Sequence, residues 1–403
     1  MVHTPSQAGQ LQKDLWISRR NQQAALGAAK SGDSHHRGVK YNGRRHLDTH
    51  AYILPIDLLF CKLLFRAFLR MSALPKAHPL HPLVRKATRR KTKRHLSPIH
   101  NLINFADINP KNIETISPVR RSPGYIPSFE SIIPPSKDVA LTFANLTNST
   151  VPVRAYSDGS GFEGGIGASA LLYINNRLAR SLKFYLGTSL EHTVYEAEGV
   201  GLLMGLHLLH ALHRQLTLPT ILGSDSQAAN RALRNQRAHS GQYILNAIHF
   251  TAERLHAKQD GLINRAERQR QAEIGEVWSG RRRGIVDLQV HWVPRHCDFG
   301  PNKQADKEAK SVAQGTSSEA RFLPQLHKKL PLSISALRQS FSDKLKNRWR
   351  RRWKGSDREN ILRTIDNSAP SKKYLRLISG LDRRQASLFS VRPKALIKGS
   401  LGG

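Results

Sequence analysis

Three consecutive apolar segments, at residues 151–157, 166–174 and 178–185, constrain the fold of this chain more than any other feature. The first ends in Asp-Gly-Ser-Gly at 158–161, which predicts a turn, and Asn-Asn at 175–176 is typical of a two-residue hairpin. Strands joined by such short connections pair in the antiparallel direction, because a parallel pair needs a long crossover. We therefore predict three consecutive antiparallel strands.

Strand and helix patterns alternate after this meander. Helices are predicted at 188–213, 226–236, 241–276 and 302–314, and further strands at 218–224 and 286–293. The order βββαβααβα is that of an α/β domain with a mixed five-stranded sheet and flanking helices. We place this domain at residues 148–318.

The flanks of this domain have a different composition. Residues 1–45 mix polar and small residues without periodicity and are predicted to form a disordered extension. Residues 46–137 read as a basic helical segment followed by a linker, since six prolines lie between 109 and 137. Residues 319–403 are predicted to be a basic, partly disordered tail.

The charge of the chain indicates its class of partner. Among 403 residues, 64 are Lys or Arg and 29 are Asp or Glu, so the formal net charge is +35. This excess argues against an ordinary acidic or neutral metabolic enzyme and favours a polyanion, with nucleic acid ahead of an anionic membrane surface. The most apolar stretch, 51–71, carries too many charges to span a membrane.

The cysteines and the N-terminus suggest an intracellular setting. Cys61 and Cys297 lie far apart and have no cysteine neighbour, which supports neither a disulfide framework nor a cysteine-rich zinc module. Residues 1–28 lack the apolar run of a secretory signal. We expect an intracellular protein, in the nucleus or the cytoplasm; the oligomeric state does not follow from the sequence.

Three basic segments each have two interpretations. A stripe of Lys62, Arg66 and Arg70 fits a solvated helix face better than a phosphate-contacting one. Seven Lys or Arg within 85–94 could bind phosphates or simply be solvated. Arg and Trp alternate within 348–354, where the two Trp could stack on bases or cover a small core.

Four acids stand at positions that suggest metal chemistry. Asp158 and Asp225 end the first and fourth predicted strands, which are natural neighbours in a mixed sheet. Glu198 lies in the first long helix and Asp306 in the last. Such a cluster suits two Mg²⁺ ions, which can stabilise both the attacking and the leaving oxygen of a phosphodiester displacement. A single Asp after a strand is more often a turn former or helix cap, and spacing alone leaves that alternative open.

Helical geometry distinguishes the two neighbouring glutamates of the first long helix. At about 100° per residue, Glu198 shares a stripe with glycines and leucines, so we predict that it faces the sheet. Glu196 shares its stripe mainly with His207, His210 and Arg214, so we predict that it faces water.

Taken together, these segments resemble the four motifs of the ribonuclease H domain, in the same order. The resemblance lies in 156–160 (Tyr-Ser-Asp-Gly-Ser), 193–198 (Thr-Val-Tyr-Glu-Ala-Glu), 224–229 (Ser-Asp-Ser-Gln-Ala-Ala), 292–296 (Trp-Val-Pro-Arg-His) and 305–310 (Ala-Asp-Lys-Glu-Ala-Lys). It covers about residues 150–315 and is nearest to the version found in fungal non-LTR retrotransposon polyproteins. No Tyr-x-Asp-Asp strand precedes Asp158, so we expect a fragment without the reverse transcriptase.

The resemblance implies a ribonuclease H-like fold and cleavage of the RNA strand of RNA–DNA hybrids. It assigns Asp158, Glu198, Asp225 and Asp306 to two Mg²⁺ ions, which Mn²⁺ can replace, and His296 to product or metal release. Pro-Asn-Lys at 301–303 departs from the family's Gly-Asn-Glu and alters the loop before Asp306. The interval from Asp225 to Asp306 is also long, with a basic insertion at about 255–283.

Two rival functions share this fold. A non-catalytic remnant would keep the fold and bind nucleic acid through its charge alone. Integrases, transposases and resolvases share the sheet topology and act on DNA duplexes or junctions, but the four motifs together favour ribonuclease H.

Overall fold

The computed structural model describes residues 52–89, 96–118, 124–216, 219–235, 237–277, 280, 284, 286–295, 297–326, 328–354, 370–372 and 376. The chain divides into two compact units. One is built from residues 1–68, 96–107 and 339–403, and the other from 69–95 and 108–338. The extension predicted at 1–45 lies outside the described residues, as do positions 90–94 of the basic run.

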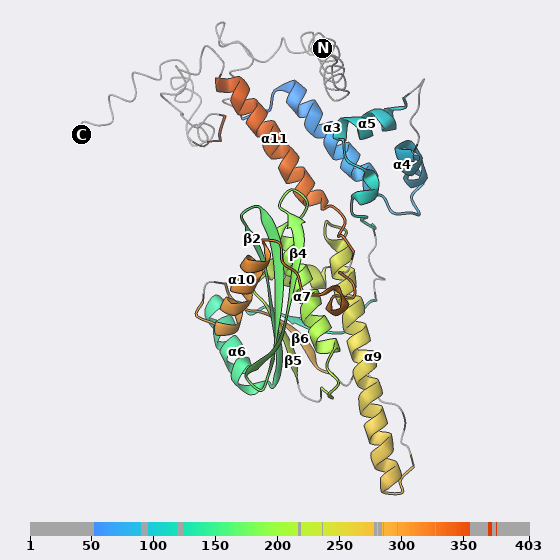
Figure 1. Ribbon diagram of the computed structural model, residues 1–403, viewed down its shortest axis with the longest axis vertical. Helices are drawn as coiled ribbons and strands as arrows, with labels where there is room; N and C mark the ends of the chain where they lie inside the picture. The colour runs from blue at the N-terminus through green and yellow to red at the C-terminus, as the bar shows by residue number, and fades with distance from the viewer. Residues whose placement is uncertain are drawn as a thin grey trace, which may run out of the picture. The chain divides into compact units, whose positions relative to one another are not determined.

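A six-stranded mixed sheet forms the centre of the larger unit (Figure 1). Its strands are β1 (Glu130–Ile132), β2 (Val153–Phe162), β3 (Gly165–Ile174), β4 (Arg177–Thr188), β5 (Thr220–Ser224) and β6 (Leu288–Trp292). Their order is β1-β6-β5-β2-β3-β4. β2, β3 and β4 pair antiparallel, whereas β2–β5, β5–β6 and β6–β1 pair parallel. The predicted mixed α/β architecture and the meander are confirmed.

The sheet has one strand more than the five predicted. β1 comes from the proline-rich segment predicted to be linker, and it pairs with β6 through three residues only. So short a strand carries no readable alternation of apolar and polar residues, which is why the sequence pattern does not show it.

The predicted turn at 158–161 is also wrong, because β2 continues through these residues to Phe162. Asp158 and Gly159 pair with Ser169 and Ala168 of β3. The reversal comes later, at Glu163 and Gly164, which both adopt positive φ. The hairpin at Asn175-Asn176 is where we predicted it, again with positive φ at both residues.

Helices cover both faces of the sheet (Figure 1). They are α6 (Lys137–Thr150), α7 (Val194–His210), α8 (Gln227–Arg234), α9 (Gln242–Glu273) and α10 (Gly300–Val312). Alternate residues of β3 serve the two faces: Ala168, Ala170 and Leu172 join the main core with α7, α8 and α9. Leu171 and Tyr173 join the smaller core beneath α6 and α10. α7 therefore lies between the sheet and α9.

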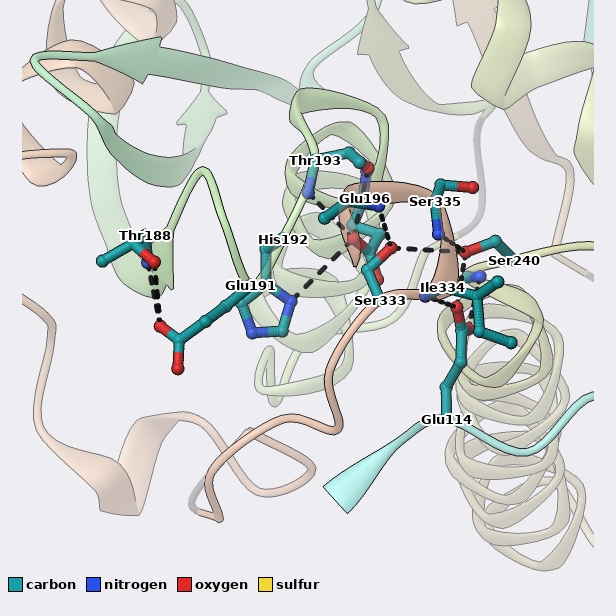
Figure 2. Close-up of polar contacts among 12 residues, drawn as sticks. Glu114, Thr188, Glu191, His192, Thr193, Glu196, Ser240, Ser333, Ile334 and Ser335 are labelled. Carbon is teal, nitrogen blue, oxygen red and sulfur yellow. Dashed lines mark hydrogen bonds and ion pairs between the residues drawn. The ribbon is translucent and has the colours of Figure 1, made fainter. Parts of the chain in front are cut away.

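The buried carboxylate of Glu114 connects three segments of this unit by hydrogen bonds. Glu114 is 1% exposed and accepts hydrogen bonds from the backbone N–H of Gly241 at 2.7 Å, the N–H of Ile334 at 2.8 Å and the Ser240 hydroxyl (Figure 2). The segment before β1 is thereby joined to the starts of α9 and α11 (Ile334–Lys354). The sequence pattern did not single out Glu114.

The remaining described helices are α3 (Ile56–Ser72), α4 (Leu80–Arg89) and α5 (Pro98–Ala106), with short 3₁₀ turns η1 (Pro110–Asn112) and η2 (Ala320–Phe322). In the smaller unit, Leu58 and Cys61 of α3 form a core with Leu345 and Trp349 of α11. Trp349 and Trp353 are 4% and 7% exposed. Their burial supports the interpretation in which the two Trp cover a small core, and Trp349 is part of that core.

Both cysteines are free thiols. Within the part of the chain that the structure describes, no helix has the length and apolar character needed to cross a membrane.

Candidate metal centre

Two neighbouring strands bring the first pair of acids together. β2 and β5 are parallel neighbours, and Ser157 pairs with Ser224. The residue after each of these serines is an acid, so Asp158, within β2, and Asp225, directly after β5, lie in the same region of the sheet. Asp225 is held further by Trp292, whose indole N–H donates to its carbonyl at 3.0 Å.

The third acid comes from α7, which begins with a capping box at Thr193 and packs closely on β2. A Cβ at Gly159 would lie 2.6 Å from the Ala197 carbonyl carbon and would overlap the α7 backbone. This glycine therefore permits the close approach of helix and strand. Glu198 is thereby placed so that one oxygen each of Asp158, Glu198 and Asp225 lie within 4.8 Å of one another.

The three carboxylates are buried, with exposed fractions of 0%, 5% and 9%. Burial, followed by the negative charges of Asp225 and Asp306, raises the pKa of Asp158 to about 8, against the opposing effect of Arg295. Burial, followed by the charges of Asp225 and Asp158, also raises the pKa of Glu198 well above its usual value. The site therefore favours any cation that can reach it.

The chemistry of these donors fits a divalent cation. Both Asp158 oxygens, Glu198 Oε2 and Asp225 Oδ1 are buried and accept no hydrogen bond from the described residues. Unpartnered buried carboxylate oxygens are costly, and they are the hard ligands that Mg²⁺ and Mn²⁺ prefer. Asp158, Glu198 and Asp225 would hold such an ion.

The fourth predicted acid is not part of this group. Asp306 lies on α10, is 36% exposed at its side chain and forms an ion pair with Lys310 at 2.5 Å. It is still near enough for its charge to raise the pKa of Asp158. His296, the fifth predicted site residue, lies outside the described residues.

The prediction that Glu196 faces water is wrong. Glu196 is 1% exposed; its Oε2 accepts from the Thr193 N–H at 2.9 Å and lies 3.9 Å from Nδ1 of buried His192 (Figure 2). His207, on the same stripe, is also buried. Because α9 covers the side of α7 that faces away from the sheet, both sides of the helix are buried. Glu196 caps the helix. Glu198 belongs to the cluster of three buried carboxylates, Asp158, Glu198 and Asp225, which we call the acid group.

Arg295, in the turn after β6, was not singled out from the sequence. Its Nε donates to Asp225 Oδ2 at 2.8 Å, and its Nη2 lies 3.7 Å from both Asp158 Oδ1 and Glu198 Oε1. One guanidinium thus faces all three carboxylates. The sequence signal was its position directly before His296 in the quoted motif.

Comparison with known proteins finds similarity to solved structures only. No family model and no curated protein matches the chain. Among solved structures, it is similar to ribonuclease H1 from the halophilic archaeon Halobacterium salinarum, with 18% identity, a TM-score of 0.27 and coverage of 41% of this chain and 98% of that one. It is also similar to an N-terminal ribonuclease H domain from Mycobacterium tuberculosis, solved as a fusion with maltose-binding protein. The identity there is 20%, the TM-score 0.27, and the coverage 40% and 96%.

By its own strand order, strand directions and flanking helices, the central unit has the ribonuclease H-like fold that the sequence motifs predict. Identities this low transfer no activity. The chemistry has to come from the residues of the acid group.

Proposed function

We propose that this protein is a metal-dependent endonuclease that hydrolyses the RNA strand of RNA–DNA hybrids. The observation that carries the proposal is the convergence of three buried carboxylates with unpartnered oxygens, one within β2, one directly after β5 and one on α7. The four motifs in their order, and the net charge of +35, support a nucleic-acid substrate. The fungal non-LTR retrotransposon as its source remains part of the proposal.

Each residue of the site would have a separate role. Asp158, Glu198 and Asp225 hold divalent cation, with Asp306 as a fourth acid that becomes available when its ion pair with Lys310 opens. The bound cation, Mg²⁺ or Mn²⁺, would supply the charge that stabilises attack of water on the phosphodiester. Cleavage would leave a 3′-hydroxyl and a 5′-phosphate. His296 would assist release of product or metal.

A specific observation also favours the second candidate, a non-catalytic nucleic-acid-binding protein. Asp306 is engaged by Lys310, and Arg295 already neutralises part of the acid group. In that case the chain would bind hybrids without cutting them.

The test is incubation of the purified full chain with labelled hybrid, duplex DNA and duplex RNA, with Mg²⁺, with Mn²⁺ and with EDTA. We expect cleavage of hybrid RNA only with metal, and its loss in Asp158→Asn and Asp225→Asn. Asp343→Asn, which removes an exposed acid on α11, is the matched control. Binding without cleavage supports the second candidate, and cleavage of duplex DNA supports an integrase-like nuclease.

A further inference from the structure

Arg295 differs from an ordinary surface arginine in what its head group faces. Its side chain is 48% exposed, whereas the side chains of Asp158, Glu198 and Asp225 are 0%, 6% and 3% exposed. The guanidinium therefore enters a buried acid group from the solvent side, with a hydrogen bond to one carboxylate and two others within 4 Å.

The charges of the group limit what else it can hold. Carboxylates bind a metal ion in their ionised form, so the three acids carry −3 when metal is bound. Arg295 adds +1, because a guanidinium does not lose its proton in proteins. One bound divalent ion makes the net charge of the site zero, whereas two bound ions leave a net charge of +2. Asp306 does not correct the excess, since Lys310 already neutralises it.

The hydrogen bonds of the acid group independently indicate that it holds one divalent ion. Arg295 satisfies Asp225 Oδ2 but leaves both oxygens of Asp158, Oε2 of Glu198 and Oδ1 of Asp225 without a hydrogen-bond partner among the described residues. The oxygens left over come from all three acids and can serve one shared ion. The Arg295 guanidinium lies beside all three carboxylates, so a second divalent cation would compete with it for the same position.

We propose that Arg295 takes the place of one of the two divalent cations. The inference rests on the proposed function, because it concerns the metal of that same site. The intact protein then binds one divalent ion per chain in the acid group, and removal of the Arg295 side chain opens a second position. Arg295 also stabilises the metal-free protein by offsetting carboxylate repulsion.

The test counts ions rather than turnover. Mn²⁺ is titrated into metal-stripped full-length protein, and free Mn²⁺ is followed by its electron paramagnetic resonance signal. We expect one tightly bound ion for the wild type and two for Arg295→Ala, with the first bound about tenfold more tightly because a nearby positive charge is gone. Arg295→Lys keeps the charge and should still bind one. Arg265→Ala, which removes an exposed arginine of α9 that donates to the Gly261 carbonyl of its own helix, should behave as wild type.

A second measurement uses thermal unfolding. In EDTA, Arg295→Ala should unfold at a lower temperature than wild type, and Mn²⁺ should raise its midpoint by more than it raises that of the wild type. Equal stoichiometry and affinity in wild type and Arg295→Ala would overturn this inference and leave the proposed function standing. No bound Mn²⁺ in either protein, or the same binding in Asp158→Asn, would overturn the metal-dependent function itself.

Discussion

Asp158 has no exposed surface and carries a pKa raised to about 8, so its ionised form destabilises the metal-free fold. An acid whose pKa is higher in the folded than in the unfolded state lowers stability as pH rises between the two values, here from about 4 to about 8. Asp158→Asn removes this loss. We expect the variant to be more stable than wild type at pH 8 in EDTA, by on the order of a few kcal/mol.

The check is chemical unfolding of both proteins at pH 5 and pH 8 without metal. The gain should shrink at the lower pH, where Asp158 is protonated in the folded wild type. A gain that is independent of pH would contradict the assigned cause. The same variant should have lost cleavage, which separates stability from activity.

The two glutamates of α7 give a second prediction at this scale. Glu198→Gln should abolish metal-dependent cleavage and Mn²⁺ binding. Glu196→Gln weakens a capping box and should cost about 1 kcal/mol of unfolding free energy while most of the cleavage remains. Denaturation and hybrid cleavage measured on both variants check the assignment, and the reverse pattern would contradict it.

The contact between α7 and β2 sets the geometry of the acid group at the scale of elements. Gly159→Ala would drive a methyl group into the backbone at Ala197 and Glu198 and separate helix from strand. We expect it to lower the unfolding free energy by about 1–3 kcal/mol, as overpacking does, and to weaken Mn²⁺ binding.

The matched control is Gly261→Ala on α9, where no described atom beyond the adjoining backbone of the helix lies within 4 Å of an added methyl group. Helix propensity alone should make this variant more stable by about 0.5–1 kcal/mol. Thermal unfolding distinguishes the two, and a neutral Gly159→Ala would show that the helix can move away without cost.

The smaller and larger units should contribute differently to binding at the scale of the whole molecule. A fragment of residues 108–338 keeps the sheet and the acid group but lacks the basic positions of α3 and most of those of α11. We expect it to cleave hybrid and to bind it with a weaker salt dependence, because fewer phosphates are neutralised. An unchanged slope of log affinity against log salt would show that these flanks do not contact nucleic acid.

The sequence was informative where local rules and tertiary structure agree. Asn175-Asn176 predicts its hairpin because both residues tolerate positive φ, and Asp225 follows an unmistakable strand. The sequence was misleading where contacts with another element of the fold determine the burial of a side chain or the length of a strand. Glu196 looks exposed until α9 covers it, and the aspartate-glycine pair at 158–159 suggests a turn until β3 extends the strand past it. Arg295 could not be placed, because only the folded loop shows which acids it meets.

The three residues of β1 have a consequence for the solubility of the protein. They pair with β6, whose Leu288 and Val290 are core residues, and they cover backbone groups that would otherwise face outward. A fragment that begins at residue 138 would leave β6 as an open apolar edge, a ready template for another chain. Self-association of that fragment, absent from one that begins at 108 and measurable by light scattering, would show that this short upstream strand protects the sheet from aggregation.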